Sequence, residues 1–197
     1  MNLGLKYVVG DDGKKHLTIA DDRRAAAIAF VQGNAAKSPP EIEAVVQEGH
    51  DALLAALDGL SEAQAQYKPS ADDWCVLELM AHVVTTKRVF ASMCENLSAG
   101  HWPPGVGEEW QEESRQDGVT LAKFETLADA LAAAQSAHDD LLKHIRALDT
   151  ANTEIRFRHF VFGDLNSREW AVFQRIHDGD HTPQIGSIRA SSGFPGA

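Results

Sequence analysis

Four stretches of the chain repeat apolar residues at three- and four-residue spacing, and this pattern limits the folds that the chain can adopt. The stretches cover residues 40–58, 74–97, 126–148 and 166–190. Gly59 ends the first stretch, and Asn166 with Glu169 forms a capping box that opens the last one. Because each amphipathic helix needs a partner for its apolar face, the sequence predicts an all-α four-helix bundle over residues 39–190.

The residues ahead of the bundle read as a separate N-terminal extension. Two strand-like runs flank a Gly/Asp turn at Gly10–Gly13, which predicts a β-hairpin. Asp21 or Asp22 caps a short helix through Phe30, and Gly33–Asn34 ends it. We therefore expect a hairpin and a short helix before the first long helix.

Two further segments depart from the helical pattern. Ile155–Arg158 alternates apolar and charged residues as a strand does, and we expect it to pair with the N-terminal hairpin. Residues 191–197 follow the last helical stretch, and we expect them to form a loose C-terminal tail. The chain thus divides into an extension (1–38), a bundle (39–190) and a tail (191–197).

The net charge of −11 leaves no surplus of basic residues for a polyanionic partner. Because DNA, RNA and anionic membranes bind basic faces, we expect no nucleic acid and no membrane as a partner. No apolar run approaches the ~20 residues that span a bilayer, and the first residues lack the plan of a signal peptide. Cys75 and Cys94 lie on one predicted helix, about 28 Å apart along its axis, so they cannot bridge each other and read as small buried residues. These features predict a cytoplasmic protein.

Three histidines lie on the apolar stripes of two predicted helices. His177 and His181 are four residues apart, so both side chains project from one side of the last helix. His82 lies on the stripe of the second helix. Burial of three imidazoles without partners would cost roughly 1–3 kcal/mol each, whereas one shared metal ion removes that cost. We therefore predict that the three histidines converge on one metal ion inside the bundle.

Hydrogen-bonded core histidines or surface histidines are the alternative interpretation, and for a single histidine that is the usual one. The pair at four-residue spacing makes the two interpretations about equal, and a third histidine at matching depth favours the metal. Pro183 presses on the carbonyl of Gly179, which predicts a bend or a widened turn beside the pair. Alternatively the helix ends near His181, but Ile185 and Ile188 continue the apolar pattern and favour a longer helix.

Two motifs on these helices occur together in one order. They read Trp74-x-x-x-Glu78-x-x-x-His82, after a Pro-containing loop, and His177-x-x-x-His181-x-x-Gln184, after Arg168-Glu169-Trp170. The arrangement resembles the DinB-like superfamily over about residues 41–190. The resemblance implies an up-down-down-up bundle, frequent homodimers, and a divalent metal, commonly zinc or nickel, on His82, His177 and His181. One departure is Thr182–Pro183, where many relatives have a basic residue and glycine.

That superfamily includes metal-dependent hydrolases, bacillithiol transferases and mycothiol-dependent maleylpyruvate isomerases. The resemblance therefore implies an enzyme in which a metal-bound water or thiol attacks a small electrophilic substrate. The other interpretation is a non-catalytic binding or stress-response protein whose metal is structural or incidental. Three ligands with an open position favour the enzyme, whereas the sequence offers no evident general base or oxyanion donor to complete a catalytic site. Expected partners are a small-molecule substrate, a low-molecular-weight thiol and a second copy of the chain.

Other polar residues near these motifs are candidates for the site. Glu78 lies one turn before the first histidine and either supports it, acts as a base, or caps the helix. Gln184 either hydrogen-bonds near the metal or fills the bundle end, and His50 either lines the pocket or is a satisfied core histidine. Asp178 and Asp180 flank the ligands in sequence but face about a third of a turn away, so we expect solvated surface carboxylates, with a hydrogen bond that supports a ligand histidine as the alternative.

Aromatic residues outside the histidine stripes have two expected roles. Trp74 and Trp170 stand at the starts of their helices and are expected to anchor the core. His101, Trp102 and Trp110 lie in the long loop after the second helix, where they form a lid or part of a dimer contact.

Overall fold

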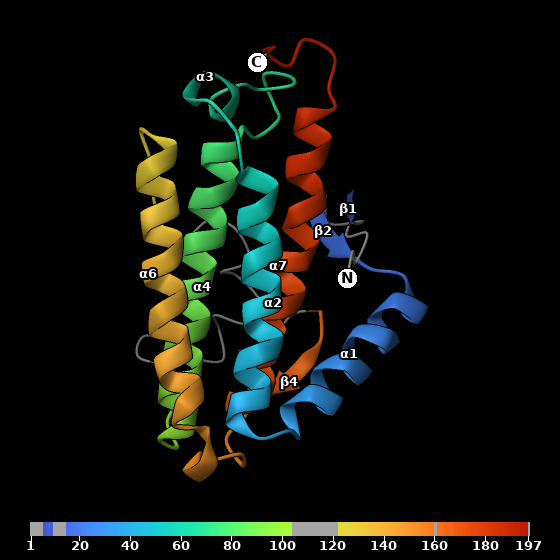
Figure 1. Cartoon of the computed structure of the whole chain (residues 1–197). Coiled ribbons are helices and arrows are strands. Elements are labelled where there is room, and N and C mark those ends of the chain that lie inside the picture. The colour runs from blue at the N-terminus through green and yellow to red at the C-terminus, as the bar shows by residue number, and fades with distance from the viewer. Residues whose placement is uncertain (1–5, 10–14, 104–121, 160, 197) are drawn as a thin grey trace.

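Four long helices lie side by side in the computed structural model of the chain (Figure 1). The structure describes residues 6–9, 15–103, 122–159 and 161–196. The long helices are α2 (Pro39–Leu57), α4 (Val76–Ser98), α6 (Leu127–Arg146) and α7 (Ser167–Arg189). The predicted four-helix bundle is confirmed. Among the residues that the structure describes, none of the helices combines the length and the apolar composition that a membrane span requires.

The four helices run up, down, down and up in the view of Figure 1, as the colour gradient along each helix shows. The short helix α3 (Glu62–Ala65) lies between α2 and α4 in the chain. In space, α2 packs against α7 and α6, and α4 packs against α6 and α7. Because α4 and α7 are antiparallel, the early part of α4 lies beside the late part of α7, which is where the three histidines stand.

Capping boxes open α2 and α7. At α2, the Ser38 N–H donates to Oε2 of Glu41 at 3.0 Å. At α7, the Asn166 N–H donates to Oε2 of Glu169 at 2.9 Å, and the Glu169 N–H donates back to Oδ1 of Asn166 at 3.0 Å. The capping box predicted for α7 is therefore confirmed. Pro183 lies inside α7 and does not end it, as the continuing apolar pattern predicted.

The N-terminal extension contains the predicted hairpin and helix. Its elements are β1 (Lys6–Val9), β2 (Lys15–Thr18) and α1 (Asp21–Ala35), with the two strands antiparallel. Helix α1 packs against α7 and α2 and buries Ala27 and Val31. It runs past the predicted end at Gly33–Asn34, because its buried face continues to Ala35.

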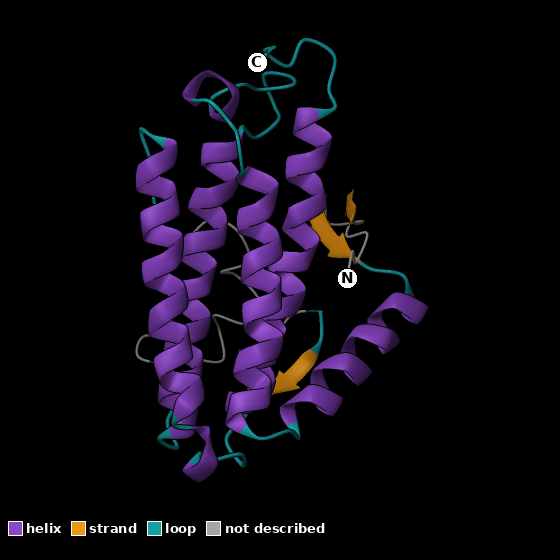
Figure 2. Cartoon of the chain, viewed as in Figure 1, coloured by secondary structure: helices purple, strands orange, loops and turns teal. Residues whose placement is uncertain are grey.

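A second small hairpin lies between α6 and α7. Its strands are β3 (Phe157–His159) and β4 (Gly163–Leu165), and they follow the 3₁₀ turn η1 (Leu148–Thr150). Figure 2 shows that strands in the described chain are confined to two small hairpins. The prediction that this segment pairs with the N-terminal hairpin is wrong, because a strand a few residues away closes a much shorter loop. Gly163, with φ of +77°, lets the chain reverse there.

A layer of buried polar residues divides the bundle core into two apolar clusters. Along α4, Val84 belongs to one cluster and Phe90 to the other; along α7, Ile185 and Ile176 divide in the same way. Each long helix contributes one polar residue to the layer. These residues, called the polar layer below, are His50 on α2, Lys87 on α4, His138 on α6 and Asp178 on α7.

Candidate metal centre

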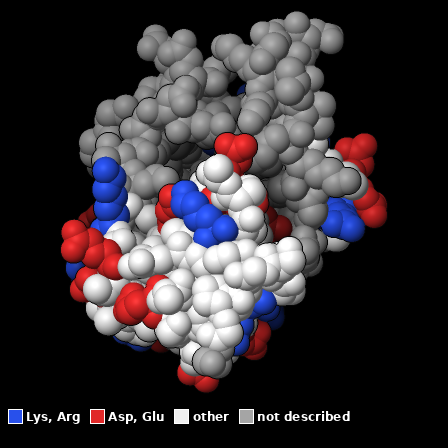
Figure 3. Space-filling view, turned by 90° about the horizontal axis from the view of Figure 1, so that it is seen from above, with Lys and Arg blue, Asp and Glu red and all other residues white. Residues whose placement is uncertain are grey.

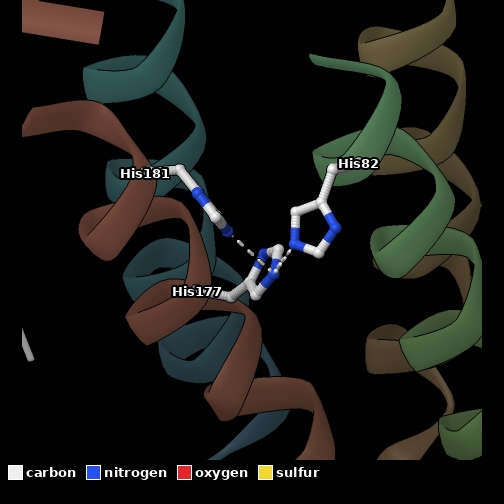
Figure 4. Close-up of side chains that lie close together, drawn as sticks. All are labelled: His82, His177 and His181. Carbon is white, nitrogen blue, oxygen red and sulfur yellow. Dashed lines mark hydrogen bonds between the residues drawn. The ribbon is translucent and has the colours of Figure 1, made fainter. Parts of the chain in front are cut away.

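Three histidine side chains from α4 and α7 converge on one point (Figure 4). The Nε2 atom of His177 lies 3.2 Å from Nε2 of His82 and 3.2 Å from Nε2 of His181. One nitrogen from each ring lies within 4.8 Å of the other two. The three histidines therefore converge as predicted. Their role as metal ligands stays a prediction. We call this group the histidine centre.

Burial keeps the three rings neutral at physiological pH. Burial, with a smaller contribution from the neighbouring His181, lowers the pKa of His82 to about 3. Burial also lowers the pKa of His177 well below its ordinary value, with His181 and His82 as further causes. The pKa of His181 is lowered by burial as well. Neutral imidazole is the form that binds metal ions, so the protonation state suits a metal.

The hydrogen bonding of the rings also fits a cation. Nε2 of His177 carries either one N–H or one in-plane lone pair, so it can make a hydrogen bond to only one of its two histidine neighbours, and the other 3.2 Å contact is left without one. A cation between the rings would instead accept a lone pair from each of the three nitrogens. In addition, Nδ1 of His181 lies 3.2 Å from Oε1 of Gln184, and donation from this Nδ1–H leaves its Nε2 lone pair facing the centre. Three neutral nitrogen donors of this kind suit zinc or nickel.

Aromatic rings border the histidine centre on two sides. The ring centroid of Phe90 lies 5.4 Å from that of His177, and the centroid of Trp74 lies 5.3 Å from that of His82. Trp74 is 43% exposed, so the prediction that it anchors the core is wrong. Helix α4 begins two residues later, at Val76, which leaves Trp74 outside the buried stripe. The same prediction for the buried Trp170 is correct.

Glu78 contacts the start of α4. Its Oε2 accepts from the Cys75 N–H at 2.9 Å, and its Oε1 lies 2.7 Å from Nζ of Lys68. The structure therefore favours the helix-capping interpretation of Glu78. The two cysteines are buried as predicted, and burial raises the pKa of the Cys75 and Cys94 thiols.

Two polar residues are placed differently from the leading expectation, and a third, His50, agrees with its core-histidine interpretation. Asp178 and Asp180 are buried, so the prediction of solvated surface carboxylates is wrong. The reason is that α7 is covered by α1, α2 and α4, which leaves little of it facing solvent. His50 is fully buried and lies 3.1 Å from Nζ of Lys87, so it is a satisfied core histidine of the polar layer and lies outside the histidine centre.

Sequence reasoning missed Lys87 and His138. Both interrupt buried apolar stripes at helical spacing, Lys87 between Val84 and Phe90 and His138 between Ala134 and Leu141. A charged or polar residue at such a position was the signal that could have identified them. Of the loop residues, Trp102 is 42% exposed, His101 is exposed, and Trp110 lies outside the described residues.

Comparison with known proteins shows what the chain is similar to. A family model described as the DinB superfamily matches residues 45–185, which is well over half of the chain. The fold is similar to a crystal structure described as TT2238, a four-helix bundle protein, with a TM-score of 0.56 and 20% sequence identity. That similarity covers 76% of this chain and 99% of the other chain, and it shows the fold alone. No curated protein matches the chain.

Proposed function

The chain belongs to the DinB superfamily, and from this premise we propose that His82, His177 and His181 bind a divalent metal ion, zinc or nickel, in an enzyme active site. The observation that supports this most is the convergence of three neutral imidazoles, with one nitrogen of each within 4.8 Å of the others. Two helices supply them, so binding depends on the folded bundle.

The activity that we propose is metal-dependent hydrolysis or thiol S-transfer to a small electrophilic substrate. A divalent metal supplies Lewis-acid chemistry there, since it lowers the pKa of a coordinated water or thiol. The chain supplies the surroundings. Gln184 orients the ring of His181, burial keeps the donors neutral, and the exposed face of Trp74 offers an apolar surface beside His82. These features support binding of a small organic molecule next to the donors.

The partners that we propose follow from the same premise. They are a small electrophile, a low-molecular-weight thiol in the transferase case, and a second copy of the chain as a homodimer in the cytoplasm. Figure 3 shows lysine and arginine side chains interspersed with acidic ones over the described surface of the face in view. This face presents no broad basic surface among the described residues, which supports a small molecule over a nucleic acid.

The test of the site is metal content. Tag-free protein purified without a nickel column would be analysed by plasma mass spectrometry as wild type, as His82→Ala and as His181→Ala. We expect about one zinc or nickel ion per chain in the wild type and its loss in both variants. His101→Ala removes an exposed histidine and is the matched control, with metal content unchanged. Wild-type metal content in His82→Ala would contradict the site.

Activity would then be screened in two assays. Hydrolysis of nitrophenyl esters tests the hydrolase, and conjugation of a chlorodinitrobenzene to bacillithiol or mycothiol tests the transferase. Metal-loaded wild type should be active in one of the assays, and His177→Ala should be inactive in both. Retention of activity by His177→Ala would contradict catalysis at this centre.

A structural metal in a non-catalytic protein is the second candidate. It is favoured by the contacts of two nearby carboxylates, which a general base would need to be free of. Glu78 contacts Cys75 and Lys68, and Asp178 contacts Lys87. Cobalt substitution separates the two candidates. If the visible spectrum of the cobalt protein changes on addition of a small thiol, an open coordination position supports the enzyme. An unchanged spectrum would support the structural metal.

A further inference from the structure

A fully buried lysine lies on the same helix as His82. The Lys87 side chain has 0% exposure, so its ammonium group cannot reach water at the surface. Its Nζ lies 3.1 Å from Oδ2 of Asp178 and 3.1 Å from Nδ1 of His50. Taking an ammonium out of water costs several kcal/mol unless partners compensate it. The polar layer is therefore built around a charge that requires its partners.

Asp178 is the counter-charge. Its carboxylate is also fully buried, and its second oxygen, Oδ1, accepts from Nε2 of Gln174 at 2.6 Å. Each carboxylate oxygen thus has a hydrogen-bond donor, as a buried polar group requires. Gln174 is one turn before Asp178 on α7 and orients the carboxylate toward α4.

The remaining members of the polar layer are neutral. Burial lowers the pKa of His50, and the adjacent Lys87 ammonium lowers it further. Because Nδ1 of His50 accepts from Lys87, its proton lies on Nε2, which is 3.4 Å from Oε1 of Gln135. His138 stacks on His50 with ring centroids 3.8 Å apart, and burial lowers its pKa to about 3. One ammonium and one carboxylate are therefore the charges of this layer, and they cancel.

Both charges act on the histidine centre, with opposite signs. Lys87 is five residues after His82 on α4, and Asp178 follows His177 on α7. Burial and the neighbouring histidines are the larger causes that lower the pKa of His177, and the Lys87 ammonium adds to them. Burial also lowers the pKa of His181, against which Gln184, Asp180 and, after them, the Asp178 carboxylate act to raise it. A positive charge at the centre is thus disfavoured by Lys87 and favoured by Asp178.

We propose that Lys87 and Asp178 are positioning residues that set the charge beside the histidine centre, with Asp178 compensating the ammonium that would otherwise repel a bound metal cation. This rests on the proposed metal site. A bound dication adds two positive charges close to a buried ammonium, so its affinity depends on the carboxylate that neutralises that ammonium. The ion pair also joins α4 to α7, the two helices that supply the donors.

Zinc affinity of charge-removing variants tests the proposal. Competition with a chromogenic chelator at pH 8 would compare wild type, Lys87→Met, Asp178→Asn and the double variant. Each single variant breaks the same ion pair while keeping the side chain close to its original size. We expect Lys87→Met to bind zinc about tenfold more tightly, Asp178→Asn about tenfold more weakly, and the double variant to lie within about threefold of wild type.

A merely structural role gives a different result. If the ion pair only held α4 against α7, both single variants would lose affinity, and the double variant would not recover it. That result, or unchanged affinities, would overturn the proposal. Lys87→Gln serves as the uncharged variant if Lys87→Met does not fold, as judged by circular dichroism.

A matched control uses another ion pair between helices. Nη2 of Arg146 lies 2.5 Å from Oε1 of Glu43, at the exposed ends of α6 and α2. Arg146→Met and Glu43→Gln change the net charge by the same amounts, and we expect unchanged zinc affinity in both.

Loss of zinc in His177→Ala identifies the site. If the wild type binds no zinc, the metal site fails and this proposal fails with it; if only the charge variants behave like wild type, this proposal alone fails.

Discussion

Gln184 lies on α7 one turn after His181, and its Oε1 is 3.2 Å from Nδ1 of that histidine. The amide oxygen accepts a hydrogen bond from Nδ1–H, so the other ring nitrogen presents its lone pair to the histidine centre. Sequence spacing alone offered two roles for Gln184, and the contact favours the one next to the ligand. Acceptors of this kind fix the orientation and tautomer of a ligating histidine.

Gln184→Leu should therefore weaken zinc binding by about tenfold to a hundredfold, because the ring of His181 loses its acceptor. Gln184→Glu keeps an acceptor oxygen and should bind zinc like the wild type or more tightly. Chelator competition measures both values. Gln32→Leu, at an exposed position of α1, is the control with unchanged affinity. Wild-type affinity in Gln184→Leu would show that the contact has no effect on the ligand.

Metal-free protein should lose stability as the pH falls below about 6.5. The pKa values of His82 and His138 are about 3 in the folded chain, whereas unfolded histidine titrates near 6.5. As the pH falls, the unfolded chain binds these protons first, so each residue costs about 1.4 kcal/mol of unfolding free energy per pH unit between 6.5 and about 3. Urea unfolding at pH 7.5 and 5.5 should show a loss of about 2 kcal/mol or more.

The same experiment on His138→Gln supplies the control for this pH dependence. The variant lacks one titrating group, so its free energy of unfolding should fall with a slope smaller by about 1.4 kcal/mol per pH unit. Equal free energies of unfolding at the two pH values in the wild type would contradict the buried neutral histidines.

Replacing each of two glycines in the long helices by a larger residue should change the free energy of unfolding in opposite directions. A Cβ atom on Gly49 of α2 would lie 2.6 Å from Cδ of Arg175 on α7, whereas Gly186 has open space around it. Gly49→Val should lower the free energy of unfolding by about 1–3 kcal/mol through overpacking. Gly186→Ala should raise it by about 0.5–1 kcal/mol through helix propensity. Thermal unfolding measures both, and a stable Gly49→Val would contradict the close approach of α2 and α7.

Trp74 should report the arrival of a metal ion. Its ring centroid lies 5.3 Å from that of His82, and its side chain is partly exposed. Because nickel and cobalt quench indole fluorescence at short range, titration with either ion should quench tryptophan emission at stoichiometric metal. Trp74→Phe should lose most of that quenching, whereas Trp102→Phe should keep it. Undiminished quenching in Trp74→Phe would place the ion away from His82.

Much of the fold could be predicted from the sequence because the information is local. Apolar spacing along 40–58 or 74–97 depends on the helical repeat alone, and the Asn166 capping box uses neighbours three residues apart. His177 and His181 could likewise be placed on one face from their spacing. The position of His82 on the apolar stripe of another helix was enough to predict that it lies beside them.

The errors concern contacts between distant segments. Whether Asp178 faces water or a lysine depends on which helix covers α7 on that side, and spacing along α7 carries no such information. Trp74 was assigned to the core because it was expected to be the first residue of an apolar helix, but the helix begins at Val76 and leaves Trp74 partly exposed. The partner predicted for the 157–159 strand was wrong for a similar reason, since residue patterns do not tell which of several strand-like segments pairs with it.

The polar layer also has a consequence for how the bundle assembles. Apolar clusters above and below it tolerate several alignments of neighbouring helices, because one leucine or valine can replace another at a contact. A shift of α4 by one turn would move Lys87 away from Asp178 and into an apolar cluster, where its charge would be uncompensated. One charged contact in the middle of the bundle therefore selects a single alignment of α4 and α7. It disfavours the misaligned packings that apolar helix faces alone would permit.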